Sequence, residues 1–244
     1  MKNIVHSIIA CITFSSCAIA QNVAKTDSIA EKMLVHQLSN GAWPKQLHDK
    51  SVVKYELPLT KELREKIKAT SYKHATIDNA ATSREINALV LAYKNTGNQS
   101  YLKAAEKGID YLLKAQYANG GWPQYYPDKS SYRAEITYND NAMINALTIM
   151  LSIAYKANGF DVVDAKYIPK AEDAVKRGID CILKTQVVQN GEKAIWAAQY
   201  DENKLTPAKA RAFEPASLST GESVGVVRFL MKLKNPSAEV KTAV

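Results

Sequence analysis

A repeated pair of helix-like segments constrains the fold of this chain more than any other feature. Residues 107–116 read Lys-Gly-Ile-Asp-Tyr-Leu-Leu-Lys-Ala-Gln, and residues 177–186 read Arg-Gly-Ile-Asp-Cys-Ile-Leu-Lys-Thr-Gln. Ahead of each copy lies a second matched segment, residues 86–97 and 148–159, with apolar residues at helical spacing and a glycine where a left-handed helix end is expected. Such internal repetition predicts stacked helix pairs, each burying one face against its neighbours.

Each repeat closes in the same way, with a glutamine, a short linker, an Asn-Gly or similar turn and a tryptophan. The three sets are Gln37, Asn40 and Trp43; Gln116, Asn119 and Trp122; Gln186, Asn190 and Trp196. Three such endings predict at least three helix pairs, and strand-like alternation is scarce outside residues 195–200. We therefore predict an all-α fold, an (α/α) barrel or toroid of repeated helical hairpins with few short strands. Residues 21–37 are expected to form a lead-in helix, and residues 61–70 a solvated connection.

The first 20 of the 244 residues read as a secretion signal. Lys2 supplies the positive start, residues 4–20 are mostly apolar, and Ala18-Ile19-Ala20 is a small-residue cleavage pattern. The run is too polar and too short for a comfortable membrane span. Lipoprotein processing at Cys17 is the less favoured alternative. We expect a secreted or periplasmic protein whose residues 21–244 form one domain, with no membrane span.

The mature chain keeps only Cys181, so no intrachain disulfide can form and the fold must depend on its core. The formal net charge of +8 suits a polyanionic partner. Nucleic acid is the common partner of such a charge, but an exported protein rarely meets it, and the lysines are dispersed along the chain. An acidic extracellular polysaccharide is the more natural partner.

Three short motifs carry the candidate chemistry. Residues 119–127 read Asn-Gly-Gly-Trp-Pro-Gln-Tyr-Tyr-Pro, residues 136–143 read Ile-Thr-Tyr-Asn-Asp-Asn-Ala-Met, and residues 76–82 read Thr-Ile-Asp-Asn-Ala-Ala-Thr. The second and third place an acid beside amides at the mouth of a helix. Flat rings near carboxylate and amide oxygens are suited to holding a sugar and a hard cation together. The alternative for each aspartate is an ordinary helix cap.

Together with Arg-Ala-Phe-Glu-Pro-Ala-Ser-Leu-Ser at residues 211–219, these motifs occur in an order that resembles the family 10 polysaccharide lyases. The resemblance spans roughly residues 38–236. It implies a helical toroid that cleaves polygalacturonate (pectate) by β-elimination with the help of Ca²⁺. Members of this family usually continue with a further stretch that helps close the toroid, so we expect this catalytic domain to be incomplete at its C-terminus.

The resemblance also implies roles for individual residues. Asp78 corresponds to a calcium ligand, with Asn79 beside it in the substrate site. Asp140 corresponds to a second acidic position near the metal and the substrate carboxylate, and Asn139 precedes it. Arg211 matches the catalytic arginine, the base that removes a proton. An arginine base is chemically awkward because its guanidinium has a pKa above about 12.

The aromatic side chains of the first motif, Trp122, Tyr125 and Tyr126, are candidates for stacking on sugar rings. The alternative is a packed turn that seals one end of the toroid. Glu214 and Glu222 are expected to be structural or orienting groups.

The leading interpretation is thus an exported, monomeric, calcium-dependent pectate lyase. It would cleave de-esterified homogalacturonan to 4,5-unsaturated oligogalacturonides. One alternative is a truncated protein that binds pectate without cleaving it. A less favoured one is a helical-toroid glycoside hydrolase that uses Asp78 and Asp140 as its pair of carboxylates.

Overall fold

The computed structural model describes residues 25–244, so the predicted signal segment and Cys17 lie outside the described residues. Eight α-helices, interspersed with short 3₁₀ turns, account for most of the regular structure of this part of the chain. They are α1 (Ser28–His36), α2 (Lys61–Ala69), α3 (Ser83–Thr96), α4 (Gln99–Ala115), α5 (Ala142–Ala154), α6 (Ile168–Thr185), α7 (Thr220–Leu230) and α8 (Ala238–Ala243).

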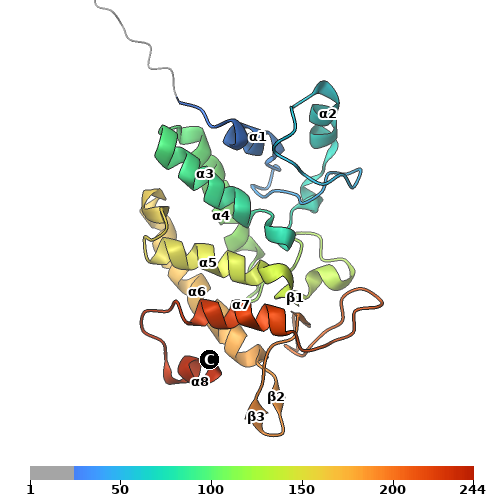
Figure 1. The fold of residues 1–244 in the computed structure, drawn as a ribbon, viewed down its shortest axis with the longest axis vertical. Coiled ribbons are helices and arrows are strands. Elements are labelled where there is room, and N and C mark those ends of the chain that lie inside the picture. The colour runs from blue at the N-terminus through green and yellow to red at the C-terminus, as the bar shows by residue number, and fades with distance from the viewer. Residues whose placement is uncertain (1–24) are drawn as a thin grey trace, which may run out of the picture.

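The helices form two layers of successive hairpins (Figure 1). Helices α3, α5 and α7 follow one another in one layer, with contacts from α3 to α5 and from α5 to α7. The other layer runs from α1 through α4 and α6 to α8, again with contacts between successive members. The predicted all-α architecture of repeated hairpins is confirmed. Within residues 25–244 the hairpins form an open row and not a closed ring, since α1 and α8 lie at opposite ends of it (Figure 1).

A glutamine at the end of α1, α4 and α6 ties each of these helices to the next helix of the second layer. Each side-chain amide donates one hydrogen bond to a carbonyl in its own turn and a second to a carbonyl of the following helix in that layer. Gln37 reaches Ala104 at 2.8 Å, Gln116 reaches Ala174 at 2.9 Å, and Gln186 reaches Ala243 at 3.1 Å. The three glutamines therefore act as equivalent clasps between hairpins.

The tryptophan that follows each clasp is buried, and its indole N–H donates a hydrogen bond of 2.8 Å to a main-chain carbonyl at the end of the preceding helix. The pairs are Trp43 with Met33, Trp122 with Leu112, and Trp196 with Ile182. The turn before Trp122 lies directly on α6. Gly120 has a φ of +90°, and a Cβ built on it would lie 1.9 Å from the carbonyl oxygen of Arg177. Only a glycine fits such an approach.

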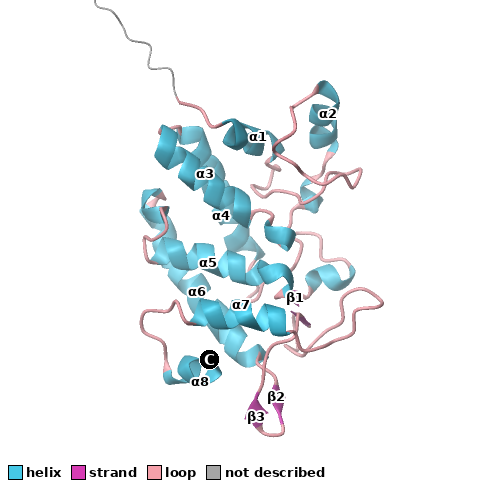
Figure 2. Cartoon of the chain, viewed as in Figure 1, coloured by secondary structure: helices cyan, strands magenta, loops and turns pink. Residues whose placement is uncertain are grey.

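Strands are few and short among the described residues, as expected (Figure 2). Strand β1 (Ile136–Thr137) pairs antiparallel with β4 (Gln199–Tyr200), which confirms a strand within residues 195–200. Strand β2 (Val188–Gln189) pairs with β3 (Glu192–Lys193). Isolated bridges join the residue after each repeat tryptophan to the segment that leads into α3, α5 or α7, and the pairs are Pro44 with Ala75, Pro123 with Ile136, and Ala197 with Leu218.

Two local expectations differ from the structure. Residues 61–69, predicted only as a solvated connection, are mostly exposed but form helix α2, in which the Thr60 side chain accepts the Leu63 N–H at the start. Gly97 ends α3 in the left-handed conformation, with a φ of 73°, as expected. Helix α5, however, already ends at Ala154. Gly159 has a φ of 87° but begins a separate 3₁₀ turn.

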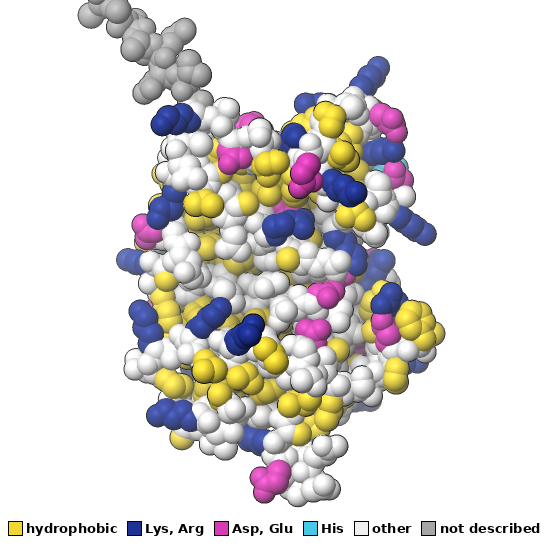
Figure 3. Space-filling view, in the orientation of Figure 1, with side chains coloured by type: hydrophobic (Ala, Val, Ile, Leu, Met, Phe, Trp, Pro, Cys, Tyr) yellow, Lys and Arg dark blue, Asp and Glu magenta, His cyan; other side chains and the backbone are white. Residues whose placement is uncertain are grey.

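Lys and Arg side chains are spread over the face shown in Figure 3 and do not gather in one patch. None of the helices within residues 25–244 is long and apolar enough to cross a membrane. The longer loops gather at one end of the hairpins, on the right in Figures 1 and 2. The bridges of the three repeats lie at this end, so it is where side chains from different hairpins meet.

Candidate active site

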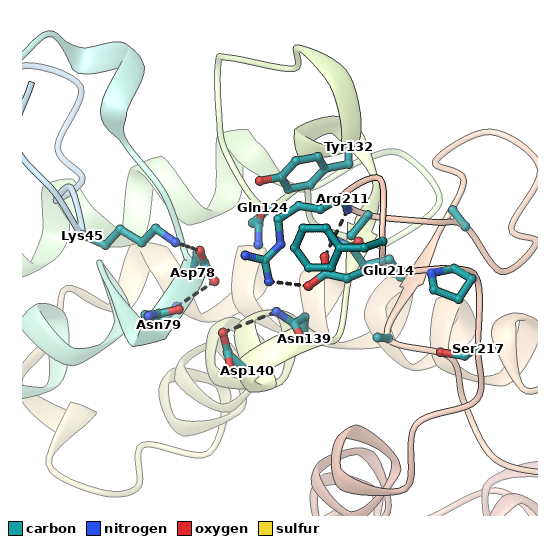
Figure 4. A pocket seen from close by; sticks show the side chains of 16 residues that line it. Lys45, Asp78, Asn79, Gln124, Tyr132, Asn139, Asp140, Arg211, Glu214 and Ser217 are labelled. Carbon is teal, nitrogen blue, oxygen red and sulfur yellow. Dashed lines mark hydrogen bonds and ion pairs between the residues drawn. The ribbon is translucent and has the colours of Figure 1, made fainter. Parts of the chain in front are cut away.

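A polar cavity of about 640 Å³ lies at the loop end of the hairpins. Five residues predicted from the sequence line it together: Asp78, Asn79, Asn139, Asp140 and Arg211 (Figure 4). They come from the mouths of two neighbouring hairpins and from the loop before α7. Its other lining residues are Lys45, Gln124, Tyr132, Ala198, Gln199, Ala208, Ala210, Phe213, Glu214, Pro215 and Ser217.

The acidic residues are presented by two 3₁₀ turns that contact each other, Asp78–Ala80 before α3 and Asn139–Asn141 before α5. Each turn contains two residues with a positive φ: Asn79 (49°) and Ala80 (59°) in the first, and Asp140 (53°) and Asn141 (57°) in the second. Asparagine and aspartate tolerate a positive φ better than other residues with a side chain. The resulting sharp corners direct polar side chains into the cavity instead of along the helix.

Asn79 lies between the two carboxylates. With its amide oriented to donate, Nδ2 is 3.1 Å from Asp78 Oδ1 and 2.9 Å from Asp140 Oδ2. The Asp78 side chain is only 4% exposed, whereas Asp140 is exposed. Burial and then the charge of Asp78 raise the pKa of Asp140. Two carboxylates held this close favour a positive group nearby.

The site contains such a positive group. The Lys45 ammonium forms an ion pair with Asp78 Oδ2 (Figure 4). Burial lowers the pKa of Lys45, but the hydrogen bond and charge of Asp78 outweigh this effect and raise it overall. Carboxylate and amide oxygens are also the donors that Ca²⁺ prefers, so the residues present fit this ion. Among residues 25–244 no three or more His, Cys, Asp or Glu side chains form a metal-binding group, so further oxygens would have to come from amides, water or a ligand.

Arg211 points into the cavity from the loop between β4 and α7 and pairs with Glu214 (Figure 4). The backbone N–H of Arg211 donates to the same carboxylate, 3.1 Å from Oε2. The hydrogen bond and charge of Glu214 raise the pKa of Arg211, and Arg211 in turn lowers the pKa of Glu214. In this arrangement the guanidinium holds its proton more firmly than a free arginine does.

Glu222, from the first turn of α7, supports the corner that carries Asp140. Its carboxylate accepts the backbone N–H of Asp140 at 3.3 Å and that of Asn141 at 3.4 Å. Burial raises the pKa of Glu222, and these two N–H groups oppose that shift. Glu222 does not line the cavity, so its contribution is to orient Asp140, in keeping with the orienting role expected for it.

The aromatic candidates lie outside this cavity. Trp122 is fully buried with its N–H satisfied by Leu112, so it has no free face for a sugar, and the packing interpretation accounts for its position. Tyr125 is half-buried beside a neighbouring cavity, where the Arg133 guanidinium lies 4.6 Å from its ring centre. Tyr126 packs edge-on against Tyr111, with ring centres 6.0 Å apart.

Sequence reasoning missed several lining residues. Lys45 and Gln124 each lie two positions after a repeat tryptophan, and Ala198 has the same relation to Trp196. All three line the cavity, so the repeat itself carried the signal. Gln199 is 3% exposed, and its Oε1 has no hydrogen-bond partner within the part of the chain that the structure describes.

A row of helical hairpins with a polar, carboxylate-bearing cavity at its loop end matches the all-helical polysaccharide lyases. The family model described as pectic acid lyase matches residues 37–244, and the chain therefore belongs to this family. No curated protein matches the chain.

Two solved structures are similar to it. One is a family 10 polysaccharide lyase from Cellvibrio cellulosa, with 38% identity and a TM-score of 0.79 over 88% of this chain and 63% of that one. The other is an aspartate-to-alanine mutant of a family 10 polysaccharide lyase from the same organism, in complex with trigalacturonic acid. Its identity is 37% and its TM-score 0.79, over 89% of this chain and 64% of that one. The chain thus spans less than two thirds of the length of either.

Proposed function

We propose that this protein is a calcium-dependent pectate lyase that cleaves de-esterified homogalacturonan by β-elimination. The observation that carries the proposal is the convergence of Asp78, Asp140 and Arg211 on one cavity from three separate segments. Membership of the pectic acid lyase family and the trigalacturonic acid complex of a similar structure support the substrate class.

The reaction requires transfer of the C5 proton of a galacturonate to a base and departure of the oxygen on C4, which takes up a proton from water and becomes a hydroxyl, while a C4–C5 double bond remains. Arg211 is the proposed base. Its ion pair with Glu214 opposes that role because it raises the pKa of the guanidinium. Release from Glu214 would remove this effect and let the guanidinium approach the sugar. The two 3₁₀ turns that carry Asp78 and Asp140 would then keep both carboxylates at the wall of the cavity.

Ca²⁺ would be held by Asp78 and Asp140, and when bound it would neutralise the substrate carboxylate and so acidify the C5 proton. The side chains of Asn139, Gln124 and Gln199 offer hydrogen-bonding groups for sugar hydroxyls along the cavity wall. A concave site with a few such polar groups is suited to fixing the orientation of one sugar unit.

The test is turnover of polygalacturonate with Ca²⁺ or with a chelator, followed by the near-ultraviolet absorbance of unsaturated uronides. Arg211→Ala is expected to abolish turnover, and Asp78→Ala to remove the calcium requirement together with most of the rate. Arg64→Ala, on the exposed face of α2, is the matched control and should match the unaltered protein.

Each alternative function has its own result in this assay. Binding of polygalacturonate without any product would favour a pectate-binding protein. New reducing ends without unsaturated products would favour a hydrolase. Full turnover by Arg211→Ala would refute the role given to this arginine.

The proposal includes export and a monomeric state. Expression with the natural N-terminus should yield a secreted or periplasmic protein that begins at Gln21, as measured by intact mass. A lipid-modified protein beginning at Cys17 would show the alternative processing. Light scattering during size-exclusion chromatography should give the mass of one chain.

A further inference from the structure

Lys45 supplies a positive charge inside the acidic part of the cavity. It follows Trp43 and Pro44, whose positions are fixed by the buried indole and by the bridge from Pro44 to Ala75. Its ammonium reaches Asp78 Oδ2, and the Lys45 side chain is 28% exposed while that of Asp78 is 4% exposed. The residue is anchored at its backbone, and only its flexible end lies at the site.

The ammonium occupies the side of Asp78 that a divalent cation would need. Asp78 Oδ1 faces Asn79, and Oδ2 faces Lys45. A second acid, Asp140, lies on the other side of Asn79. A buried carboxylate is costly without a positive partner, so Lys45 stabilises the site when no metal is bound. A divalent cation held by Asp78 would compete with this ammonium for the carboxylate.

A displaced Lys45 ammonium could lie in either of two adjoining cavities, because Lys45 lines both of them. The second cavity has a volume of about 400 Å³ and is also lined by Lys50, Lys73 and Arg133; its one carboxylate, Asp128, is already paired with Arg133. These like charges disfavour another ammonium there. The catalytic cavity is where a uronate carboxylate would lie, so a displaced Lys45 is better paired on that side.

We propose that Lys45 is a positioning residue that exchanges partners, holding Asp78 in the metal-free protein and passing to the substrate carboxylate once a divalent cation takes Asp78. This rests on the proposed lyase function and adds to it a competition between an internal cation and the metal. Lys45 is therefore expected to have opposite effects on the two affinities: it weakens metal binding and strengthens substrate binding.

The test compares Lys45→Met with Lys73→Met, which removes the same charge from an exposed position in the adjoining cavity. Isothermal titration with Ca²⁺ alone is expected to give a dissociation constant roughly tenfold lower for Lys45→Met, about 1.4 kcal/mol. The KM for polygalacturonate at saturating Ca²⁺ should rise severalfold in the same variant. Lys73→Met should leave the Ca²⁺ dissociation constant within about twofold of the unaltered protein. A purely structural role for Lys45 would weaken both kinds of binding.

A measurement on the unaltered protein covers the case in which Lys45→Met does not fold. Reductive methylation followed by mass spectrometry should label Lys45 slowly in chelator and faster with Ca²⁺, while Lys73 labels at the same rate in both. Equal protection of Lys45 in both conditions would overturn the exchange.

An unchanged or weaker Ca²⁺ affinity in folded Lys45→Met would overturn the exchange while leaving the lyase proposal in place. Failure of the unaltered protein to bind Ca²⁺ would refute both the exchange and the calcium component of that proposal. Turnover that needs no calcium would then show that the lyase assignment itself survives.

Discussion

The turn that carries Trp122 offers a sharp test of how the hairpins are joined. Gly120 and Gly191 both follow an asparagine in equivalent repeat endings, and both have a positive φ, +90° and +86° respectively. They differ in their surroundings. A Cβ on Gly120 would lie 1.9 Å from the Arg177 carbonyl oxygen, whereas a Cβ on Gly191 would have no atom within 4 Å. Alanine at the two positions therefore separates backbone strain from close contact.

We expect Gly191→Ala to lower the free energy of unfolding by about 1 kcal/mol, the cost of placing a residue with a Cβ in left-handed backbone. Gly120→Ala carries the same cost and must also push the turn away from α6. Overpacking of this kind costs about 2 kcal/mol more. The shift would also stretch the bond from Gln116 Nε2 to the Gly120 carbonyl, which is 3.0 Å long. The expected total for Gly120→Ala is about 3 kcal/mol.

Equilibrium unfolding in urea measures both variants, and equal m-values would show that the comparison is valid. Because the Gly120 turn also positions Gln124 at the cavity, Gly120→Ala should raise the KM for polygalacturonate, and Gly191→Ala should not. Equal losses of stability for the two variants would refute the claim that the contact with α6, and not the backbone conformation, requires glycine at position 120.

Three further predictions follow from single side chains. Glu222→Ala removes the acceptor for the N–H groups of Asp140 and Asn141, so it should lower the free energy of unfolding in urea by about 2 kcal/mol and kcat/KM at least tenfold. Glu222→Gln keeps one acceptor and should give values between these and those of the unaltered protein. Stability and kcat/KM equal to those of the unaltered protein would contradict this role. Burial, with nearby acids, raises the pKa of Glu135 to about 7 from an ordinary value of 4.5. The folded state therefore binds the Glu135 proton more tightly than the unfolded state does. The resulting stabilisation is fully present below about pH 4.5 and is lost as the pH rises through 7. After allowance for solvent screening the effect is about 1 kcal/mol, and Glu135→Gln should remove that slope from stability measured between pH 5 and 8; an unchanged slope would count against it. Burial raises the pKa of the Cys181 thiol to about 12, so a thiol reagent at pH 8 should label it only after unfolding, and fast labelling of the native protein would show that the helix α6 packing is looser than described.

The hairpin architecture could be predicted because the side chains at each repeat ending must donate hydrogen bonds to particular main-chain carbonyls. Gln116 and Gln186 must satisfy carbonyls on two segments, and Trp122 and Trp196 must satisfy one more, so these residue types recur at fixed places. The same logic favours the packing interpretation of Trp122 over the stacking one. A tryptophan in a Gly- and Pro-rich turn resembles an exposed sugar platform, but here its N–H is used inside the core.

The candidate site was predictable as far as the repeat extends. Asp78 and Asp140 precede neighbouring helices of one layer, so their meeting follows from the stacking of hairpins. Lys45 could have been found from its register with Gln124. The pairing of Arg211 with Glu214 depends on the conformation of an irregular loop. Because no sequence periodicity determines that conformation, the ion pair could not be predicted from the sequence.

The three glutamine clasps affect the order in which parts of the protein unfold. Within residues 25–244, a hairpin in the middle of the row is held by an amide on each side, whereas a hairpin at either end of the described row is held on one side only. Loss of structure should therefore begin at the ends of the row and move inward, as in other linear repeat proteins. Asp78 and Asp140, at the mouths of the central hairpins, would then keep their places longest, whereas Lys45 and Arg211, which come from the two ends of the row, would leave the cavity first.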